Sequence, residues 1–98
     1  MTPRRQAFDL VQGTHIVVAD PPPTGVFYVP APQDGRAVFV MPWHGQTLIG
    51  TTETAYHGYP AQVMPLRSEI AYLQEVYRHY FPAAQARVVE SFAGLRVL

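Results

Sequence analysis

Apolar positions over the first two-thirds of the chain fall into short runs that are separated by turn sequences, which favours strands. The run LVQGTHIVV at residues 10–18 is rich in β-branched residues and predicts a first strand. Two more apolar runs, at 25–31 and 37–43, flank the sequence PQDG, whose Asp-Gly pair predicts a hairpin. A turn at 44–46 leads to a fourth strand at 47–52. Short strands joined by tight turns indicate an antiparallel sheet.

Near residue 66 the spacing of the apolar positions lengthens to three and four residues, which predicts one amphipathic helix. Its apolar stripe comprises Leu66, Ile70, Leu73, Tyr77 and Tyr80 or Phe81. Pro82 ends this helix, because proline lacks the amide hydrogen that the next turn needs.

The last stretch, ARVVESFAGLRVL, returns to alternation and predicts a further strand, with Glu90, Phe92 and Arg96 on one face. We therefore expect an α+β fold, an antiparallel β-sheet of about five strands with one amphipathic helix packed on one face. Residues 1–98 are expected to form a single domain. Because the sequence ends at Leu98 within an apolar run, we expect it to be a piece of a longer protein.

The composition excludes several classes of function. A hydrophobic fraction of 48% with 14% charged residues argues against disorder. Seven basic and seven acidic side chains cancel, so we expect no nucleic-acid partner, since phosphate backbones are held by clustered cations. No apolar run approaches the roughly 20 residues of a membrane span, and the polar N-terminus has no signal-peptide core. We expect a soluble, cytoplasmic chain.

No sequence motif announces a cofactor, a metal or a nucleophile. The chain has neither a glycine-rich dinucleotide turn nor a P-loop nor a metalloprotease helix, and it has no cysteine. The histidines lack the spacing of metal ligands, so no metal site is expected. They are His15, His44, His57 and His79.

A few polar residues in apolar surroundings are candidates for chemistry. His15 is either a hydrogen-bonded core residue or a pocket residue, and the residues alone favour the core. Thr51 and Thr52 either contact an anion or pair across strands, and pairing is the more common arrangement. Arg96 requires a buried anion, a carboxylate partner or exposure. Glu90 lies on the same face, six positions away.

Four segments in this order, GTHIVV, DGRAVFVMPW, TLIGTTET and SFAGLRVL, resemble the FAD-dependent glycerol-3-phosphate dehydrogenases and the related glycerophosphate oxidases. The helical segment EIAYLQEVYRHYF matches between the third and the fourth. The resemblance covers nearly all of this chain but a minor fraction of the family's length, and the glycine-rich turn that holds the FAD pyrophosphate lies outside it.

The resemblance implies a substrate-domain fragment of an enzyme that oxidises glycerol 3-phosphate to dihydroxyacetone phosphate. Electrons would pass to the flavin and then to quinone or oxygen. FAD is expected in the longer parent enzyme and not on this chain, which we expect to be inactive by itself.

The resemblance also implies roles for particular residues. The family's pocket histidine falls on His15, which favours a catalytic role over a core role, and its substrate-binding arginine falls on Arg96. Thr51 and Thr52 are expected to bind substrate, and no residue is assigned to the cofactor. The chain departs from the family at Glu53, where aspartate is usual, and at its last residues, RVL in place of RPL.

The alternative belongs to a different class, a free-standing binding or interaction module that binds a small phosphorylated ligand without redox activity. For the fragment, the expected partners are glycerol 3-phosphate, the rest of the flavoenzyme, and another copy through exposed sheet edges. The parent is expected in the cytoplasm, and at the membrane surface if quinone is its acceptor.

Overall fold

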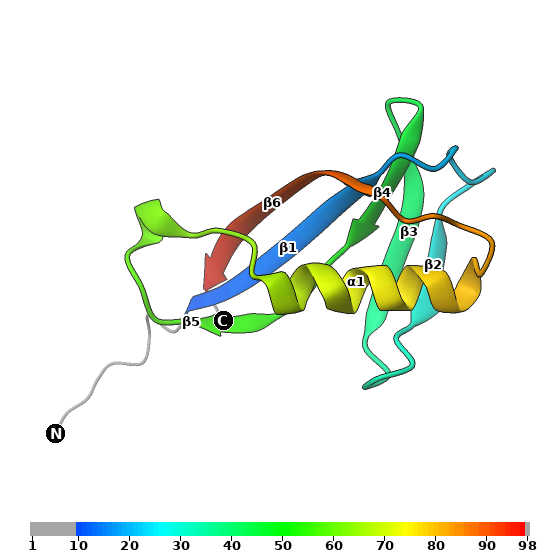
Figure 1. Ribbon diagram of the computed structural model, residues 1–98. Helices are drawn as coiled ribbons and strands as arrows, with labels where there is room; N and C mark the ends of the chain where they lie inside the picture. Colours follow the sequence, from blue (N-terminus) through cyan, green and yellow to red (C-terminus); the bar gives the residue numbers. More distant parts are fainter. Residues whose placement is uncertain (1–9, 98) are drawn as a thin grey trace, which may run out of the picture.

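The computed structural model describes residues 10–97 and has one helix packed on an antiparallel sheet (Figure 1). The expected α+β fold is confirmed, although the sheet has six strands where about five were predicted. The strands are β1 (Leu10–Val18), β2 (Phe27–Pro30), β3 (Ala37–Trp43), β4 (Gln46–Gly50), β5 (Thr54–Tyr56) and β6 (Val88–Val97), and the helix is α1 (Arg67–Tyr80). A 3-10 turn occupies Pro60–Gln62. The additional strand is β5, whose three residues are too few to show alternation.

The central strand is β1, which has neighbours on both sides. Along one edge it pairs with β4 through residues 15–18 and with β5 through residues 10–12. Along the other edge it pairs with β6 over its whole length. The order across the sheet is therefore β2, β3, β4, β1 and β6, with β5 continuing the edge of β1 beyond β4.

The turn between β3 and β4 explains how these strands align. Trp43 lies opposite Gln46, so the loop has two residues, His44 and Gly45. Both have positive φ, 48° and 78°, as in the two-residue turns whose twist matches that of the flanking strands. This alignment places Phe39 directly opposite Gly50.

Helix α1 covers one face of the sheet, and the hydrophobic core lies between them (Figure 1). Removing a large apolar side chain from water stabilises the fold by roughly 1.5–3 kcal/mol. The largest buried members are Ile16, Val18, Val38, Val40 and Ile49 from the sheet and Leu73, Val76 and Tyr77 from the helix. Of the predicted stripe, Leu66 lies outside this core and is 45% exposed, because it precedes the first helical turn.

A buried carboxylate attaches the start of α1 to the sheet. Glu69 Oε1 accepts hydrogen bonds from Gln12 Nε2 (2.7 Å), Thr14 Oγ1 (2.7 Å) and the backbone N–H of Leu66 (2.9 Å). Burial by itself raises the pKa of Glu69, but the Leu66 amide and neighbouring hydroxyls outweigh it and lower that pKa overall. The helix start is thus held by polar contacts where its apolar stripe ends.

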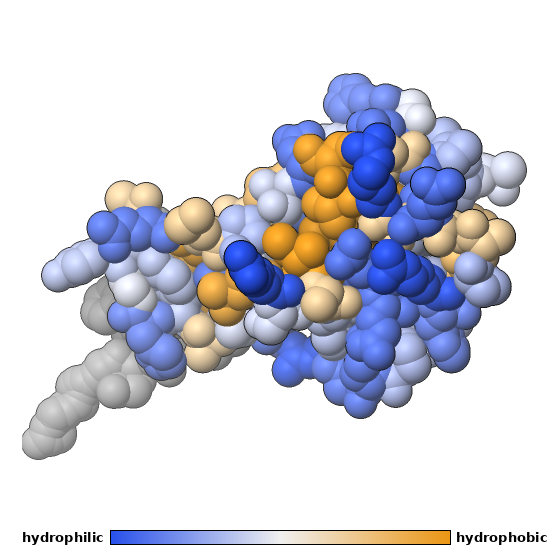
Figure 2. Space-filling model, in the orientation of Figure 1, coloured by the Kyte–Doolittle hydropathy of each residue, from blue (hydrophilic) through white to orange (hydrophobic). Residues whose placement is uncertain are grey.

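On the helix side, a band of apolar surface follows β6, flanked by hydrophilic residues (Figure 2). Val89 and Val97 of this strand are 42% and 60% exposed. Within residues 10–97, α1 is the longest helix at 14 residues, and no helix there has the length and apolar character needed to cross a bilayer.

Candidate functional site

The sheet face opposite α1 carries a row of aromatic rings at one level of the strands. The register aligns one residue from each of five strands: Tyr28, Phe39, Gly50, His15 and Phe92. Neighbouring ring centroids lie 6.0 Å apart between Tyr28 and Phe39 and 5.7 Å apart between Phe39 and His15. The result is a row of aromatic side chains on the face that the helix leaves free, with ring planes inclined by 73° between Tyr28 and Phe39 and by 46° between Phe39 and His15.

His15 is at the centre of this row. Its ring stacks on Phe92 with a centroid distance of 5.2 Å and an interplanar angle of 7°. A Cβ atom on Gly50 would come within 2.3 Å of the His15 ring, so only glycine fits there. His15 therefore lies on the face away from the core, and the preference for a core histidine drawn from its neighbours in sequence is not supported.

The charge state of His15 follows from its surroundings. Burial and the nearby Arg96 cation both lower the pKa of this imidazole from its ordinary value of 6.5. The ring is therefore mainly neutral at neutral pH. A neutral imidazole can accept a proton or a hydrogen bond, which is what a general base requires.

Next to His15 is a hollow of about 330 Å³. His15, Thr51 and Arg96, three of the four residues expected in the site, line it together with Phe92 and glycines 13 and 94. A Cβ on Gly13 would lie 2.9 Å from Thr51 Oγ1 and 3.0 Å from Arg96 Nη1, so glycine makes room for both polar groups. The hollow thus combines a cation, a hydroxyl and a neutral imidazole.

Thr52, the fourth expected site residue, lies on the helix side and is buried. Its hydroxyl donates to Glu69 Oε2 at 2.9 Å and accepts from the backbone N–H of Thr14 at 3.0 Å. The structure therefore does not bring Thr52 to the hollow, because consecutive residues of an extended segment point to opposite faces. Thr52 does pair across strands with a threonine, because it exchanges hydrogen bonds with the backbone of Thr14 on β1, and both hydroxyls donate to Glu69.

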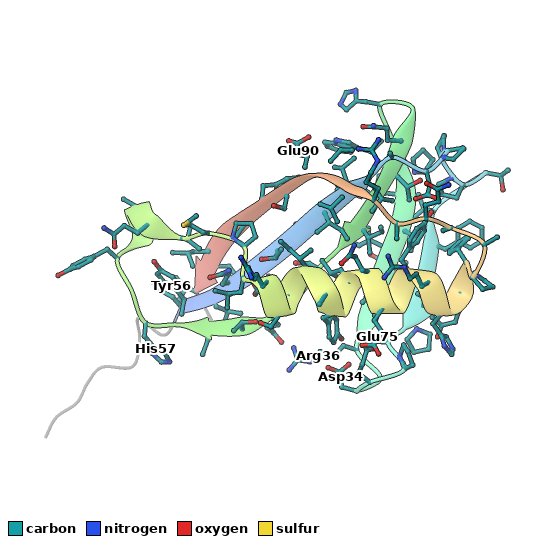
Figure 3. The ribbon with its side chains drawn as sticks, viewed as in Figure 1. Asp34, Arg36, Tyr56, His57, Glu75 and Glu90 are labelled. Carbon is teal, nitrogen blue, oxygen red and sulfur yellow. The ribbon has the colours of Figure 1, made fainter. Side chains whose placement is uncertain are left out.

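The carboxylate partner of Arg96 is Glu53, one of the positions at which the sequence departs from the family. Arg96 Nη2 lies 3.0 Å from Glu53 Oε2. Glu90, the candidate considered from sequence, lies opposite Val17, at the other end of β6, and Figure 3 shows it far from the Asp34–Arg36 pair. Alternation could have indicated that Glu53 lies on the same side of its extended segment as Thr51. It could not indicate that Arg96 lies nearby, because the sequence does not show which strand pairs with the strand of Arg96.

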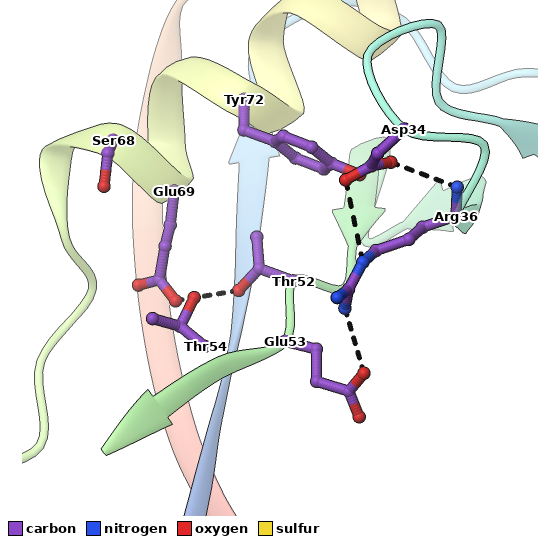
Figure 4. Close-up of a pocket in the computed structure, with 8 residues that line it drawn as sticks. All are labelled: Asp34, Arg36, Thr52, Glu53, Thr54, Ser68, Glu69 and Tyr72. Atoms are coloured by element: carbon purple, nitrogen blue, oxygen red, sulfur yellow. Dashed lines mark hydrogen bonds and ion pairs between the residues drawn. The ribbon is translucent and has the colours of Figure 1, made fainter. Parts of the chain in front are cut away.

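A second hollow, of about 260 Å³, lies on the helix side beside Glu53 (Figure 4). Asp34 accepts hydrogen bonds there from the Arg36 backbone N–H (3.1 Å) and the Tyr72 hydroxyl (2.8 Å), which lower the pKa of Asp34. Burial and the Asp34 contact raise the pKa of Tyr72 to about 12. This tyrosine is therefore a hydrogen-bond donor at neutral pH.

Metal binding has no support among the side chains that the structure describes. In residues 10–97, no three histidine, cysteine, aspartate or glutamate side chains come together as metal ligands would. The polar side chains that line the main hollow are His15, Thr51 and Arg96.

Comparison with known proteins gives one consistent result. Residues 2–98 match the family model described as FAD dependent oxidoreductase. The chain is 38% identical over 92 residues to the aerobic glycerol-3-phosphate dehydrogenase of Escherichia coli and 37% identical to D-erythritol 1-phosphate dehydrogenase of Brucella abortus. Each match covers 91% of this chain and 18% of the relative.

A solved structure agrees in fold. The glycerol-3-phosphate dehydrogenase from Bacillus halodurans, complexed with FAD, superimposes with a TM-score of 0.85 at 32% identity. The similarity covers 92% of this chain and 19% of that one. The resemblance noted in the sequence is confirmed, and this chain spans about a fifth of the length of the proteins that it matches.

Proposed function

This chain belongs to the family of FAD-dependent oxidoreductases, and from that premise we propose that it is the substrate-side part of a larger flavoenzyme that oxidises glycerol 3-phosphate to dihydroxyacetone phosphate. The observation that carries the proposal is the hollow shared by His15, Thr51 and Arg96. Sequence reasoning selected these residues from separate segments, and the fold gathers them on one face.

The three side chains suit a phosphorylated alcohol. A guanidinium binds an anionic oxygen with charge-assisted hydrogen bonds, so Arg96 is the group for a phosphate or a developing ketone oxygen. A neutral imidazole accepts the proton of a hydroxyl group, so His15 is the group for the alcohol that becomes the ketone. The Thr51 hydroxyl, at the rim of the hollow, adds a hydrogen bond that orients the substrate.

A flavin could approach this chain on the sheet face that α1 leaves uncovered. The aromatic row lies on the uncovered sheet face, and within it the His15 and Phe92 rings are nearly parallel, at 7°, whereas Phe39 is tilted by 46° to His15. Aromatic side chains on an open sheet face are compatible with packing against a planar ring system. The sequence contains no glycine-rich turn for the pyrophosphate, so the remaining part of the enzyme would have to hold the dinucleotide. When bound, FAD would accept the hydride from the carbon that bears the hydroxyl group, while His15 would take the proton of that hydroxyl group.

The partners of the chain follow from the same proposal. They are glycerol 3-phosphate, the rest of the flavoenzyme and, for the isolated chain, a second copy. Among the described residues, β2 pairs only with β3, and β6 pairs only with β1, so each has one free hydrogen-bonding edge. Free edges with exposed apolar side chains recruit further strands.

The proposal is tested in the longer enzyme that contains this chain. Under anaerobic conditions, glycerol 3-phosphate should bleach the bound flavin, whereas glycerol and inorganic phosphate should not. D-erythritol 1-phosphate is the matched competitor, because a relative with 37% identity, against 38% for the glycerol-3-phosphate dehydrogenase, is named for it. Faster bleaching by D-erythritol 1-phosphate would make that compound the preferred substrate in place of glycerol 3-phosphate. If neither compound bleached the flavin, the proposal would be overturned.

A further inference from the structure

Glu53 divides its two oxygens between two arginines from different parts of the fold. Oε1 lies 2.9 Å from Arg36 Nη1, and Oε2 lies 3.0 Å from Arg96 Nη2. Arg36 precedes β3, and Arg96 is in β6, on the other side of the central strand. One carboxylate therefore links the rim of the helix-side hollow to the rim of the main hollow.

The two terminal nitrogens of Arg96 have different surroundings. Nη2 is held by Glu53, whereas Nη1 lies over Gly13, 3.0 Å from where a Cβ would stand. Thr51 Oγ1 lies 2.9 Å from the same point. Because Glu53 takes only Nη2, Nη1 remains at the hollow, next to the Thr51 hydroxyl and available for an anionic oxygen.

Glu53 is itself held in place on both sides. The residue before it, Thr52, donates its backbone N–H to the Thr14 carbonyl at 3.3 Å and is bonded through its hydroxyl to the buried Glu69. The second arginine that contacts Glu53, Arg36, is held in turn by Asp34, with 3.6 Å between Arg36 Nε and Asp34 Oδ2. Asp34 also accepts a hydrogen bond from the Tyr72 hydroxyl. The carboxylate is thus presented from a fixed backbone and braced by a second cation (Figure 4).

Stability alone does not account for this arrangement. The side chains of Arg36, Glu53 and Arg96 are 50%, 44% and 49% exposed, and ion pairs at such positions typically contribute little to folding. A charged network that contributes little to stability can still fix the orientation of a guanidinium. Its main effect is then on how well that guanidinium binds an anion.

We propose that Glu53, braced by Arg36, is a positioning residue that holds the Arg96 guanidinium over the hollow beside Gly13, with one terminal nitrogen left free for an anionic oxygen. The identity of that oxygen as part of the substrate rests on the function proposed above. The positioning of Arg96 does not, and it can be measured on this chain without substrate.

The first experiment uses the His15 imidazole as a reporter, with its pKa measured by NMR in the 98-residue chain. Arg96→Gln should raise the pKa of His15, because the Arg96 charge lowers it. In Glu53→Gln, two outcomes are possible. If Arg96 stays in place, the loss of the Glu53 negative charge lowers the pKa of His15 further. If Glu53 positions Arg96, the guanidinium moves away, and the pKa of His15 rises toward the Arg96→Gln value.

The direction of the change therefore decides between positioning and simple electrostatics. A fall in the pKa of His15, or no change, in Glu53→Gln would overturn the proposal. Glu90→Gln is the matched control, since it removes a carboxylate from β6 without contacting Arg96, and it should not raise the pKa of His15. Glu53→Asp keeps the charge and should restore part of the wild-type value.

The second experiment adds the substrate, in the longer flavoenzyme. Glu53→Gln should raise the KM for glycerol 3-phosphate about five- to tenfold and change kcat by less than about twofold, as expected when a binding group is misplaced. An unchanged or lowered KM would contradict a positioning role in binding. If the wild-type enzyme does not oxidise glycerol 3-phosphate, the proposed function fails, and the NMR result still decides the positioning.

Discussion

Arg96 and His15 line the same hollow, but their surroundings give them different tasks. Arg96 is half exposed, and Glu53 holds only one of its terminal nitrogens, so the guanidinium can bind an anion through the other without losing its carboxylate partner. His15 is half-buried among aromatic rings and stays neutral. Each residue therefore allows a separate prediction in the longer flavoenzyme.

Replacing Arg96 should mainly weaken the stabilisation of an oxyanion. A charge-assisted contact is worth about 1.5–3 kcal/mol, so Arg96→Ala should lower kcat/KM by roughly tenfold to a few hundredfold. Arg96→Lys should recover only part of this, since lysine keeps the charge but lacks the planar fork. Arg67→Ala, an exposed arginine at the start of α1, is the control and should leave kcat/KM unchanged. Wild-type kcat/KM in Arg96→Ala with full flavin content would make Arg96 structural.

The pH dependence should report on His15. As a general base it works when neutral, so kcat/KM should rise with pH through a pKa below 6.5 and become flat above it. Arg96→Ala removes one of the causes of the lowered pKa, and this acid limb should move to higher pH. His15→Gln should remove the limb and lower kcat with little change in KM. If the limb persisted in His15→Gln, the base would be another group.

At the scale of single elements, the first turn of α1 is held to the sheet mainly by Glu69, because the apolar stripe of the helix begins after this turn. This carboxylate accepts hydrogen bonds from β1, from the segment before β5 and from the helix's own N-terminus. Gln at this position would present an NH₂ group to partners that are themselves donors. A buried donor without an acceptor is costly, so the substitution affects the whole helix–sheet contact.

We predict that Glu69→Gln lowers the free energy of unfolding by about 2–3 kcal/mol at neutral pH. Urea titration of the isolated chain measures this. Glu75→Gln is the matched control on the same helix, because Glu75 is exposed and accepts one hydrogen bond from Gln33, at 2.8 Å. It should cost less than about 0.5 kcal/mol. Equal losses in the two variants would contradict the role given to Glu69.

The same residue should make stability depend on acid. The folded-state pKa of Glu69 is lowered, so its contribution is present above its unfolded-state pKa and is lost as pH falls through the folded-state value. Glu69→Gln should therefore differ most from wild type at neutral pH and least in acid. A difference that grows with acidification would have the wrong sign.

At the scale of the whole molecule, we propose that the chain is the substrate side of a flavoenzyme, and its sequence contains no glycine-rich dinucleotide turn. We predict that the purified 98-residue chain is colourless, binds FAD no better than a nonspecific control, and does not reduce a dye with glycerol 3-phosphate. Absorbance spectra and equilibrium dialysis check this. Stoichiometric flavin in the purified protein would contradict it.

The free edges of the sheet lead to a prediction about association. The isolated chain should form dimers or larger species as its concentration rises, measured by light scattering, because β6 exposes an unpaired edge and apolar side chains such as Val97. Val97→Lys should shift the distribution toward monomer, whereas Glu75→Lys, on the helix, should not. A strict monomer at the highest soluble concentration would contradict the prediction.

Much of the fold was readable in the sequence because it follows from local rules. β-branched runs, an Asp-Gly turn and three- to four-residue spacing predicted the main strands and α1. The fifth strand, β5, was missed because it has three residues and forms only by pairing with β1. The helical stripe was right at Leu73 and Tyr77 and wrong at Leu66, because spacing shows which residues align but not where the helix contacts the sheet.

The amino-acid sequence by itself determined the fold class, the family and the residue types of the site. Only the tertiary structure decided which of those residues meet, because strand register joins segments that are far apart in the chain. It placed His15 over Gly50 and beside Phe92, sent Thr52 to the opposite face, and gave Arg96 the carboxylate of Glu53. Contacts across a sheet depend on which strands pair as well as on alternation, and alternation within one strand does not say which strand lies beside it.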